Sequence, residues 1–206
     1  MPQVNLDEMV EAVCAGRSLI SFPTDTVPAL AACPTAAEQI FAAKQRSPEK
    51  PLILMAASVD EVWDYVVGSE AERVIWQQMM NRYWPGAVTL VLPASDRVPS
   101  VMNPKDPSTI GVRIPDHTIA RAILQRTKPL ATTSANRSGE PALLHMPDIE
   151  ATFPEVLTLA SEALTKLSPA DNLEAILLGS GMPSTVIRWM GDRWQVLRQG
   201  AVLVEE

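Results

Sequence analysis

The sequence is poor in the residues that build covalent or metal-dependent sites. Its 206 residues include two cysteines, Cys14 and Cys33, and two histidines, His117 and His145. Two cysteines at this spacing form neither a disulfide framework nor a zinc site, and we expect both to be buried thiols. His117 follows a predicted helix cap and His145 lies in a weakly patterned segment, so we expect neither to be a catalytic base or a metal ligand. Covalent and histidine-dependent catalysis are therefore disfavoured.

Long hydrophobic runs and the common nucleotide-binding signatures are absent as well. No apolar run is long enough to span a bilayer, and the stretch MPQVNLDEMVEAV carries acidic residues where a signal peptide carries basic ones. The sequence has no Walker-type phosphate loop, no dinucleotide-binding glycine fingerprint and no serine nucleophile elbow. We therefore expect a cytoplasmic protein with no membrane contact, whose site belongs to none of these three classes.

Basic residues are outnumbered by acidic ones, 17 to 24, which gives a formal net charge of −7. The chain as a whole is therefore not drawn to nucleic acid or to an anionic membrane, and a bound polyanion must meet a local cluster of Lys and Arg. The apolar fraction of 47% is typical of a globular protein. Because the sequence shows neither an internal repeat nor a break in composition, we expect one domain over residues 1–206.

Strand and helix patterns alternate along the chain. Short apolar runs predict strands, and apolar stripes of helical spacing that follow a capping residue predict helices. The predicted caps are Asn5, Thr35, Ser58 and Asp116, and a longer helix is predicted over about residues 69–82. The predicted strands cover residues 18–22, 52–56, 88–92, 110–114 and 130–131, with short terminal strands at 174–178, 184–187 and 194–197. This alternation predicts an α/β sandwich with a mixed sheet. We expect the five tryptophans to pack in the core: Trp63, Trp76, Trp84, Trp189 and Trp194.

Two polar loops directly follow predicted strands. The run TTSANRSG at 132–139 has small hydroxyl and amide side chains, and Gly139 allows a ligand to approach the backbone closely. Taken alone, such a run is more often an ordinary polar turn. The second loop, PTDTVP at 23–28, is held by two prolines. A third polar stretch, at 95–108, could form a mobile lid.

Basic residues stand at the ends of predicted elements beside these loops: Lys44, Arg46, Lys50, Arg113 and Arg198. Arginine gives bidentate hydrogen bonds to phosphate or carboxylate and lysine gives a compact charge. Such residues can position and neutralise a phosphoryl group without a covalent intermediate. For Lys44 and Arg46 a simpler explanation also holds, because cations in the last turn of a helix favour its dipole by a few tenths of a kcal/mol.

Six motifs, in order over nearly the whole chain, resemble those of the YrdC/Sua5 family. They are PTDT at 23–26, KQR at 44–46, GVRIP at 111–115, SAN at 134–136 with SGEP at 138–141, STVI at 184–187, and Arg198 with Gly200. The resemblance implies an open, twisted mixed α/β sheet flanked by helices. It also implies synthesis of L-threonylcarbamoyladenylate from L-threonine, bicarbonate and ATP, with release of pyrophosphate, for the N6-threonylcarbamoyl group on adenosine 37 of tRNA.

The resemblance assigns roles position by position. The family's tetrad, expected around the nucleotide phosphates and the carbamate, corresponds to Lys44, Arg46, Ser134 and Asn136. The ATP positions correspond to Arg46, Lys50, Thr109, Ser134, Ala142 and Arg198. The L-threonine positions correspond to Thr26, Met55, Arg113, Thr132 and Ser184. We expect Mg²⁺ to be held mainly by phosphates and water, since the sequence has no carboxylate cluster. Contact with the machinery that transfers the group to tRNA is expected to be transient.

Three departures from the family pattern bear on substrate choice. Pro28 and Ala29 stand where many relatives have Tyr-Gly, Met55 stands where His is frequent, and Arg188 replaces an Asp. Longer relatives carry a further C-terminal domain, so this chain resembles the short form. Two alternatives stay open: an RNA-binding protein of the same fold, whose affinity would fall steeply with salt, and a divergent paralogue in carbamoyl or nucleotidyl transfer.

Overall fold

The computed structural model describes residues 3–45, 47, 50–168 and 179–204. Within these ranges the chain forms an eight-stranded sheet with the order β10-β9-β5-β6-β4-β7-β3-β2, and β1 pairs with β8 beside it. The strands are β1 (Gln3–Val4), β2 (Ile20–Phe22), β3 (Ala29–Ala32), β4 (Ile53–Met55), β5 (Val88–Pro93), β6 (Thr109–Arg113), β7 (Leu130–Ser134), β8 (Thr158–Leu159), β9 (Thr185–Trp189) and β10 (Trp194–Arg198). The helices are α1 (Leu6–Cys14), α2 (Glu38–Lys44), α3 (Val59–Val62), α4 (Glu70–Tyr83), α5 (Thr118–Thr127), α6 (Met146–Thr152) and α7 (Ser161–Leu167).

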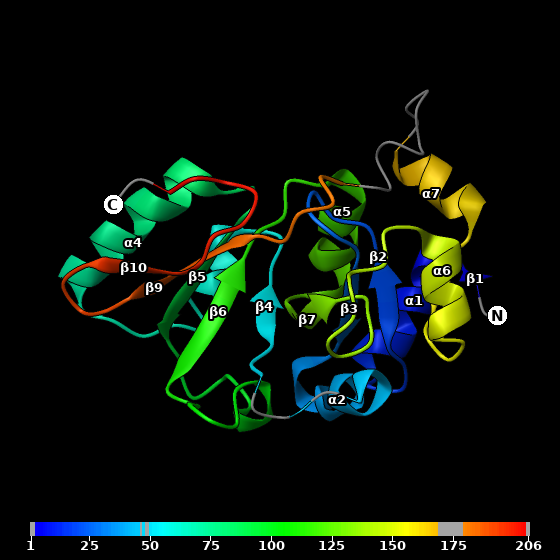
Figure 1. Cartoon of the computed structure of the whole chain (residues 1–206), viewed down its shortest axis with the longest axis horizontal. Coiled ribbons are helices and arrows are strands. Elements are labelled where there is room, and N and C mark those ends of the chain that lie inside the picture. Colours follow the sequence, from blue (N-terminus) through cyan, green and yellow to red (C-terminus); the bar gives the residue numbers. More distant parts are fainter. Residues whose placement is uncertain (1–2, 46, 48–49, 169–178, 205–206) are drawn as a thin grey trace.

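The sheet is mixed and flanked by helices, which confirms the predicted fold class (Figure 1). Neighbours β4 and β6, and β5 and β9, run parallel, while the other pairs are antiparallel. The sequence did not predict β3, because its Ala-Leu-Ala-Ala run has little intrinsic strand preference. The segment becomes a strand because its backbone pairs with β2 on one side and with β7 on the other. The strand predicted at 174–178 lies outside the described residues.

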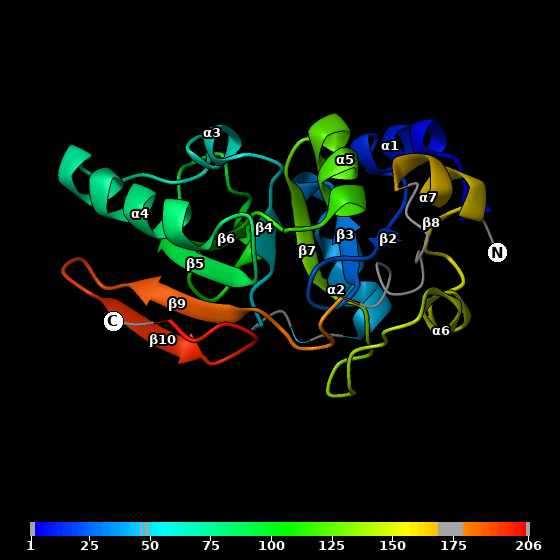
Figure 2. The ribbon, with the colours of Figure 1, turned by 90° about the horizontal axis from the view of Figure 1, so that it is seen from above.

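One face of the sheet is covered along its whole length. Leu30, Leu54 and Leu90 point into a core cluster that includes Ile40 of α2 and Trp76 of α4. Helices α2, α6 and α4 cover this same face of the sheet. In Figure 2, α2 and α6 lie below the β2 end and α4 lies above the β10 end, because the right-handed twist between strands turns the face over along the sheet. Three of the five tryptophans, Trp76, Trp84 and Trp189, are buried, and Trp63 and Trp194 pack against the same cluster, as predicted.

The opposite face is covered only near β2. There Ala29, Ala31 and Met55 pack against α1, α5 and α7 through side chains such as Met9 and Ile123. Further along, at β5, β6 and β9, the same face carries mainly polar side chains together with Gly111 and two valines, and no helix of the described residues lies over it. The alternation of side chains along each strand therefore leaves an open concave floor at this end of the sheet.

The predicted helix caps are correct only in part. Asn5 caps α1, because its Oδ1 accepts the amide of Glu8 at 3.0 Å. The prediction for Thr35 was wrong: a 3₁₀ turn occupies 34–36 and α2 begins after Ala37 with no side-chain cap. Ser58 stands at the N-cap of α3 but its side chain makes no capping hydrogen bond. The spacing of residues in the sequence predicts a cap correctly only where the backbone conformation also lets the side chain accept a hydrogen bond from an amide of the first helical turn.

The cap of α5 is His117 rather than the predicted Asp116. The Nδ1 atom of buried His117 accepts the amide of Ala120 at 3.3 Å. An imidazole nitrogen can replace a carboxylate oxygen in this role because it also has a lone pair. His117 therefore has a structural task at a helix end.

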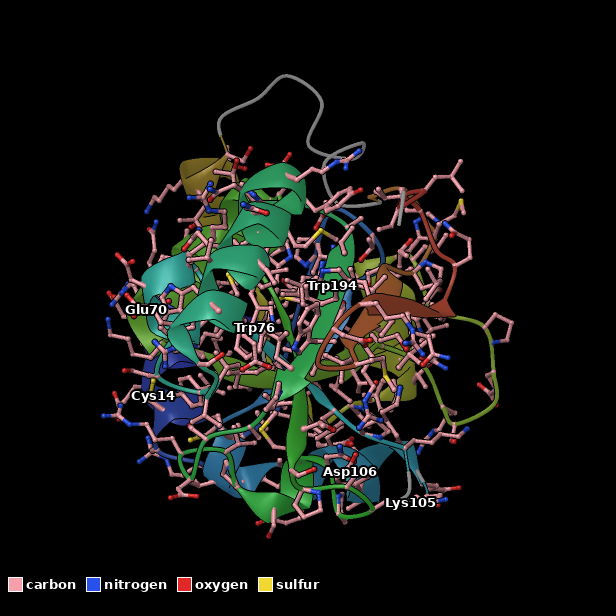
Figure 3. All side chains as sticks on the ribbon, turned by 90° about the vertical axis from the view of Figure 1, so that its left-hand side faces the viewer. Cys14, Glu70, Trp76, Lys105, Asp106 and Trp194 are labelled. Carbon is pink, nitrogen blue, oxygen red and sulfur yellow. The ribbon has the colours of Figure 1, made fainter. Side chains whose placement is uncertain are left out.

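The prediction of buried cysteines was wrong for Cys14, which is exposed on the outer side of α1 (Figure 3). Met9 and Val13 face the core from this helix, and Cys14 is turned about 100° from Val13. Cys33 is half-buried. In the part of the chain that the structure describes, no helix is both long and apolar enough to cross a membrane.

We expect Leu90→Ala to lower the free energy of unfolding by about 3 kcal/mol, because it leaves a cavity beneath α4 at the centre of the covered face. Val74→Ala is the control, since Val74 is 56% exposed on α4, and should change stability by less than about 0.5 kcal/mol. Urea unfolding of both variants measures the difference. Equal effects would contradict the core assignment.

Candidate functional site

A cavity of about 540 Å³ occupies the uncovered face of the sheet. Its volume is typical of sites that bind a small molecule or a nucleotide. Nine of the residues that the sequence singled out line it: Thr26, Lys50, Met55, Thr109, Arg113, Thr132, Ser134, Ser184 and Arg198. Three others, Lys44, Asn136 and Ala142, do not line it. Arg46 lies outside the described residues.

Strand register builds the floor of this cavity. Thr132, Ile53, Gly111, Val91 and Arg188 are register partners in succession across β7, β4, β6, β5 and β9. Partners in neighbouring strands point to the same face, so these five positions form one row beneath the cavity. A Cβ atom at Gly111 would come within 2.9 Å of Ile53 Cγ2, so the glycine keeps the floor of the cavity open. The row thus begins at the hydroxyl of Thr132 on β7 and ends at the guanidinium of Arg188 on β9.

Arg113 lies almost entirely buried where the loop at 23–28 meets the sheet. Its Nη2 pairs with Asp25 Oδ1 at 2.6 Å, and its Nη1 donates to Thr26 Oγ1 at 2.8 Å. Its Nε donates to the carbonyl of Gly86 at 3.0 Å. A buried guanidinium needs such partners, and the three fix the plane of the group. The remaining N–H groups of Arg113 can serve an anion in the cavity.

The loop that carries Asp25 and Thr26 is itself fixed by hydrogen bonds. The hydroxyl of Thr24 donates to the carbonyl of Val27 at 2.7 Å and accepts the amide of Thr26 at 3.2 Å. From outside, the amides of Ser180 and Gly181 donate to the carbonyls of Asp25 and Thr26. The sequence predicted a rigid loop here from its prolines. Its hydroxyl network, which no pattern marked, adds a second constraint.

Two guanidinium groups come close together at one end of the cavity. Arg198 Nη2 donates to the carbonyl of Ser184 at 2.8 Å, and the hydroxyl of Ser184 bonds with that of Thr89 at 2.9 Å. Burial lowers the pKa of Arg113, and burial together with repulsion from Arg113 lowers the pKa of Arg198. Both groups stay charged near neutral pH. An anion between them would relieve this repulsion.

Positive charge is concentrated in the cavity although the whole chain is acidic. Among the described residues that line it, one is acidic, Asp106, and five are basic: Lys50, Lys105, Arg113, Arg188 and Arg198. Such a concave positive surface attracts anions even when the net charge of the protein is −7. Three of the five cations that the sequence singled out, Lys50, Arg113 and Arg198, belong to this group.

Asp106 and Lys105 are site residues that the sequence did not single out. They come from the polar stretch at 95–108 and lie together at one edge of the molecule (Figure 3). Asp106 Oδ2 pairs with Arg188 Nη2 at 3.1 Å, and hydrogen bonds from Ser108 and Thr109 together with Arg188 lower the pKa of its carboxyl. Asn103 Nδ2 donates to the Asp106 carbonyl at 2.6 Å. Arg188 thus ties this loop to β9, a role that the sequence could not indicate because the loop's partner is distant in the chain.

The polar run after β7 forms the predicted strand-to-loop corner. Ser134, the last residue of β7, faces the cavity, and Asn136 lies behind it. Lys44, at the end of α2, is 1% exposed and reaches the same corner from below. Ala142 follows the corner on the far side of the glycine turn. No cluster of three or more His, Cys, Asp or Glu that could hold a metal ion occurs among the described residues.

Removing the partner of a buried charge should destabilise the protein strongly. Asp25→Asn leaves Arg113, which is 3% exposed, without its carboxylate, and we expect the free energy of unfolding to fall by about 3 kcal/mol. Asp64→Asn removes the surface partner of Arg97 and should lower it by less than about 1 kcal/mol. Denaturant unfolding at neutral pH compares the two. Similar losses would show that the Asp25–Arg113 pair is not a buried one in solution.

Comparison with known proteins places the chain in a family. A family model for Sua5, YciO and YrdC proteins, described as "Telomere recombination", matches residues 13–200. A threonylcarbamoyl-AMP synthase of Chromohalobacter salexigens is 33% identical over 168 residues, which are 79% of this chain and 89% of the relative. The corresponding enzyme of Pyrococcus abyssi is 40% identical over 153 residues, 68% of this chain and 43% of the relative.

A solved structure gives the same result. P. abyssi Sua5 in complex with L-threonine is similar to this chain with a TM-score of 0.75 at 29% identity, covering 95% of this chain and 54% of that one. The chain thus spans most of one relative and about half of the longer one. The match of the family model over nearly the whole chain, together with the identity to the Chromohalobacter enzyme, shows that this protein belongs to the Sua5/YciO/YrdC family.

Proposed function

We propose that the protein is a threonylcarbamoyl-AMP synthase that uses L-threonine, bicarbonate and ATP and releases pyrophosphate. The observation that carries the proposal is a single cavity with two chemically different ends. One end has hydroxyls around a buried guanidinium, and the other has several cations beside a polar strand end. The names of the relatives support the same reaction.

The end where Arg113 meets the loop at 23–28 fits L-threonine. Arg113 offers the remaining N–H groups of its fixed guanidinium to a carboxylate, and Thr26, Thr132 and Ser184 offer hydroxyls within the same cavity. Buried Met55 provides apolar surface for the methyl group of the amino acid. The relative from P. abyssi binds L-threonine, which supports this assignment.

The other end fits the nucleotide. Lys50, Thr109 and Ser134 line it, and Lys105 and Arg188 add charge that the family resemblance did not include. Arg198 lies beside Ser184 and Arg113 at the other end, so its contact with the nucleotide stays a prediction. The nucleotide-side roles of Arg46, which lies outside the described residues, and of Ala142, which does not line the cavity, stay predictions. The excess of cations suits the triphosphate of ATP.

The reaction needs the threonine amine to form a carbamate with bicarbonate, with loss of water. A carbamate oxygen must then attack the α-phosphorus of ATP while the bond to pyrophosphate breaks. The cations of the cavity would neutralise the charge that spreads over the phosphoryl oxygens, and the fixed guanidinium would hold the threonine portion in line. Mg²⁺ would enter with ATP, supply further charge neutralisation and be held mainly by phosphate oxygens and water. Asp106 is the cavity carboxylate that could add one ligand, although Arg188 is its partner in this structure.

The product would pass to the machinery that attaches the threonylcarbamoyl group to adenosine 37 of tRNA. We propose a transient contact with that machinery and a cytoplasmic location, since tRNA is the final acceptor. Direct RNA binding is the weaker alternative, because the cations lie inside a cavity rather than along an exposed face.

Pyrophosphate release from ATP, with bicarbonate and with or without L-threonine, tests the proposal. We expect release to depend on threonine. Thr132→Val keeps the shape of the site but removes a hydroxyl, and should raise the KM for threonine about tenfold; Lys50→Met should raise the KM for ATP by a similar factor.

The controls are Thr165→Val and Lys166→Met, the same changes at exposed positions of α7. Neither should alter either KM. Absence of threonine-dependent release from the folded wild-type protein would refute the synthase. Release with both KM values unchanged in the two site variants would refute the assignment of the two ends.

A further inference from the structure

We propose that Lys44 and Asn136 are positioning residues that act through Ser134, and that Ser134 is the member of this trio that meets the nucleotide. The kinetic part of this inference rests on the proposed function. Its structural part concerns only how the corner after β7 is held. Family resemblance places all three residues around the phosphates, whereas the geometry separates them.

Lys44 is buried and its ammonium points into the protein backbone. The Nζ atom donates to the carbonyl of Ser134, to the carbonyl of Asn136 at 2.5 Å and to the Oδ1 of Asn136 at 3.1 Å. An ammonium group has three N–H donors, and these three oxygens suffice for them. Lys44 therefore holds the backbone on both sides of Ala135, at Ser134 and at Asn136. It does not line the cavity.

The side chain of Asn136 is also engaged with the protein. Its Oδ1 accepts from Ser134 Oγ at 2.5 Å and from Lys44, and its Nδ2 donates to the carbonyls of Arg137 at 2.8 Å and Glu140 at 2.7 Å. An amide makes about four hydrogen bonds in total, two at each end. Asn136 therefore orients the hydroxyl of Ser134 and closes the loop up to Glu140.

The same corner is bound to α2 by further contacts around Lys44. The amide of Ser138 donates to the carbonyl of Lys44 at 3.2 Å, and Arg137 Nη1 donates to the carbonyl of Ala43 at 2.8 Å. The corner and the end of α2 thus form one hydrogen-bonded unit. Loss of the Lys44 ammonium would leave buried carbonyl oxygens without a donor, and the corner would have to move to reach water.

Hydrogen–deuterium exchange tests the structural part without any substrate. In Lys44→Met the amides of residues 134–143 should exchange at least about tenfold faster, because the network that protects them is opened. In Ser134→Ala, which removes only a hydroxyl, exchange should stay within about twofold of the wild type. Lys166→Met is the control for the loss of a lysine. If Lys44→Met fails to fold, Asn136→Ala is measured in its place.

A double-mutant cycle on kcat/KM for ATP tests the kinetic part. Ser134→Ala and Lys44→Met should each lower it about 100-fold. The double variant should be close to the worse single variant, because Lys44 has little left to position once the hydroxyl is gone. A direct phosphate contact by Lys44 would make the two losses multiply, to roughly 10⁴-fold.

The two experiments separate failure of this inference from failure of the proposed function. Unchanged exchange in Lys44→Met, or multiplying losses in the cycle, would overturn the positioning role even if the wild type is an active synthase. A wild type without threonine-dependent pyrophosphate release would overturn the function. In that case the hydrogen–deuterium exchange of Lys44→Met would still decide whether Lys44 stabilises the backbone after β7.

Discussion

The twist of the eight-stranded sheet is the constraint on which the site depends. Each strand is rotated against its neighbour, so helices that cover one face at the β2 end cannot follow it to the β10 end. Helices α1, α5 and α7 end their coverage near β4, and α4 packs on the opposite face beyond it. The face left open between them is the floor of the cavity. No separate domain is needed to form a concave surface, because the twist supplies it.

Two buried cations show how this fold accommodates charge near the open face. Arg113 has a carboxylate partner, Asp25, and keeps part of its guanidinium toward the cavity. The described contacts of Lys44 are with backbone and amide oxygens instead. The first arrangement keeps a cation available to a ligand, while the second uses a cation to shape the protein. Both satisfy the rule that a buried charge must find oppositely polarised atoms.

The loop at 95–108 contributes an ion pair and a further cation to the site. Where the family pattern has an Asp after the STVI motif, Arg188 pairs with Asp106 and ties the loop to β9. Lys105 brings a further charge to the cavity beside it. The departure from the pattern thus appears with a matching carboxylate, which lies 82 residues away in the sequence. A pair of this kind cannot be recognised in a single sequence, because nothing local connects the two positions.

The sequence by itself determined the alternation of elements, the α/β class and nine of the residues that line the cavity. Strand runs such as 88–92, the polar loops and the ordered motifs carry this information locally. Only the tertiary structure decided which of these residues face the cavity. Lys44 and Lys50 look alike in the sequence, six positions apart and both basic, yet one is buried behind Ser134 and the other lines the site. The same holds for β3 and for the cap at His117. Each depends on where a distant strand or helix lies, and the direction in which a side chain points is set by register and packing rather than by residue type.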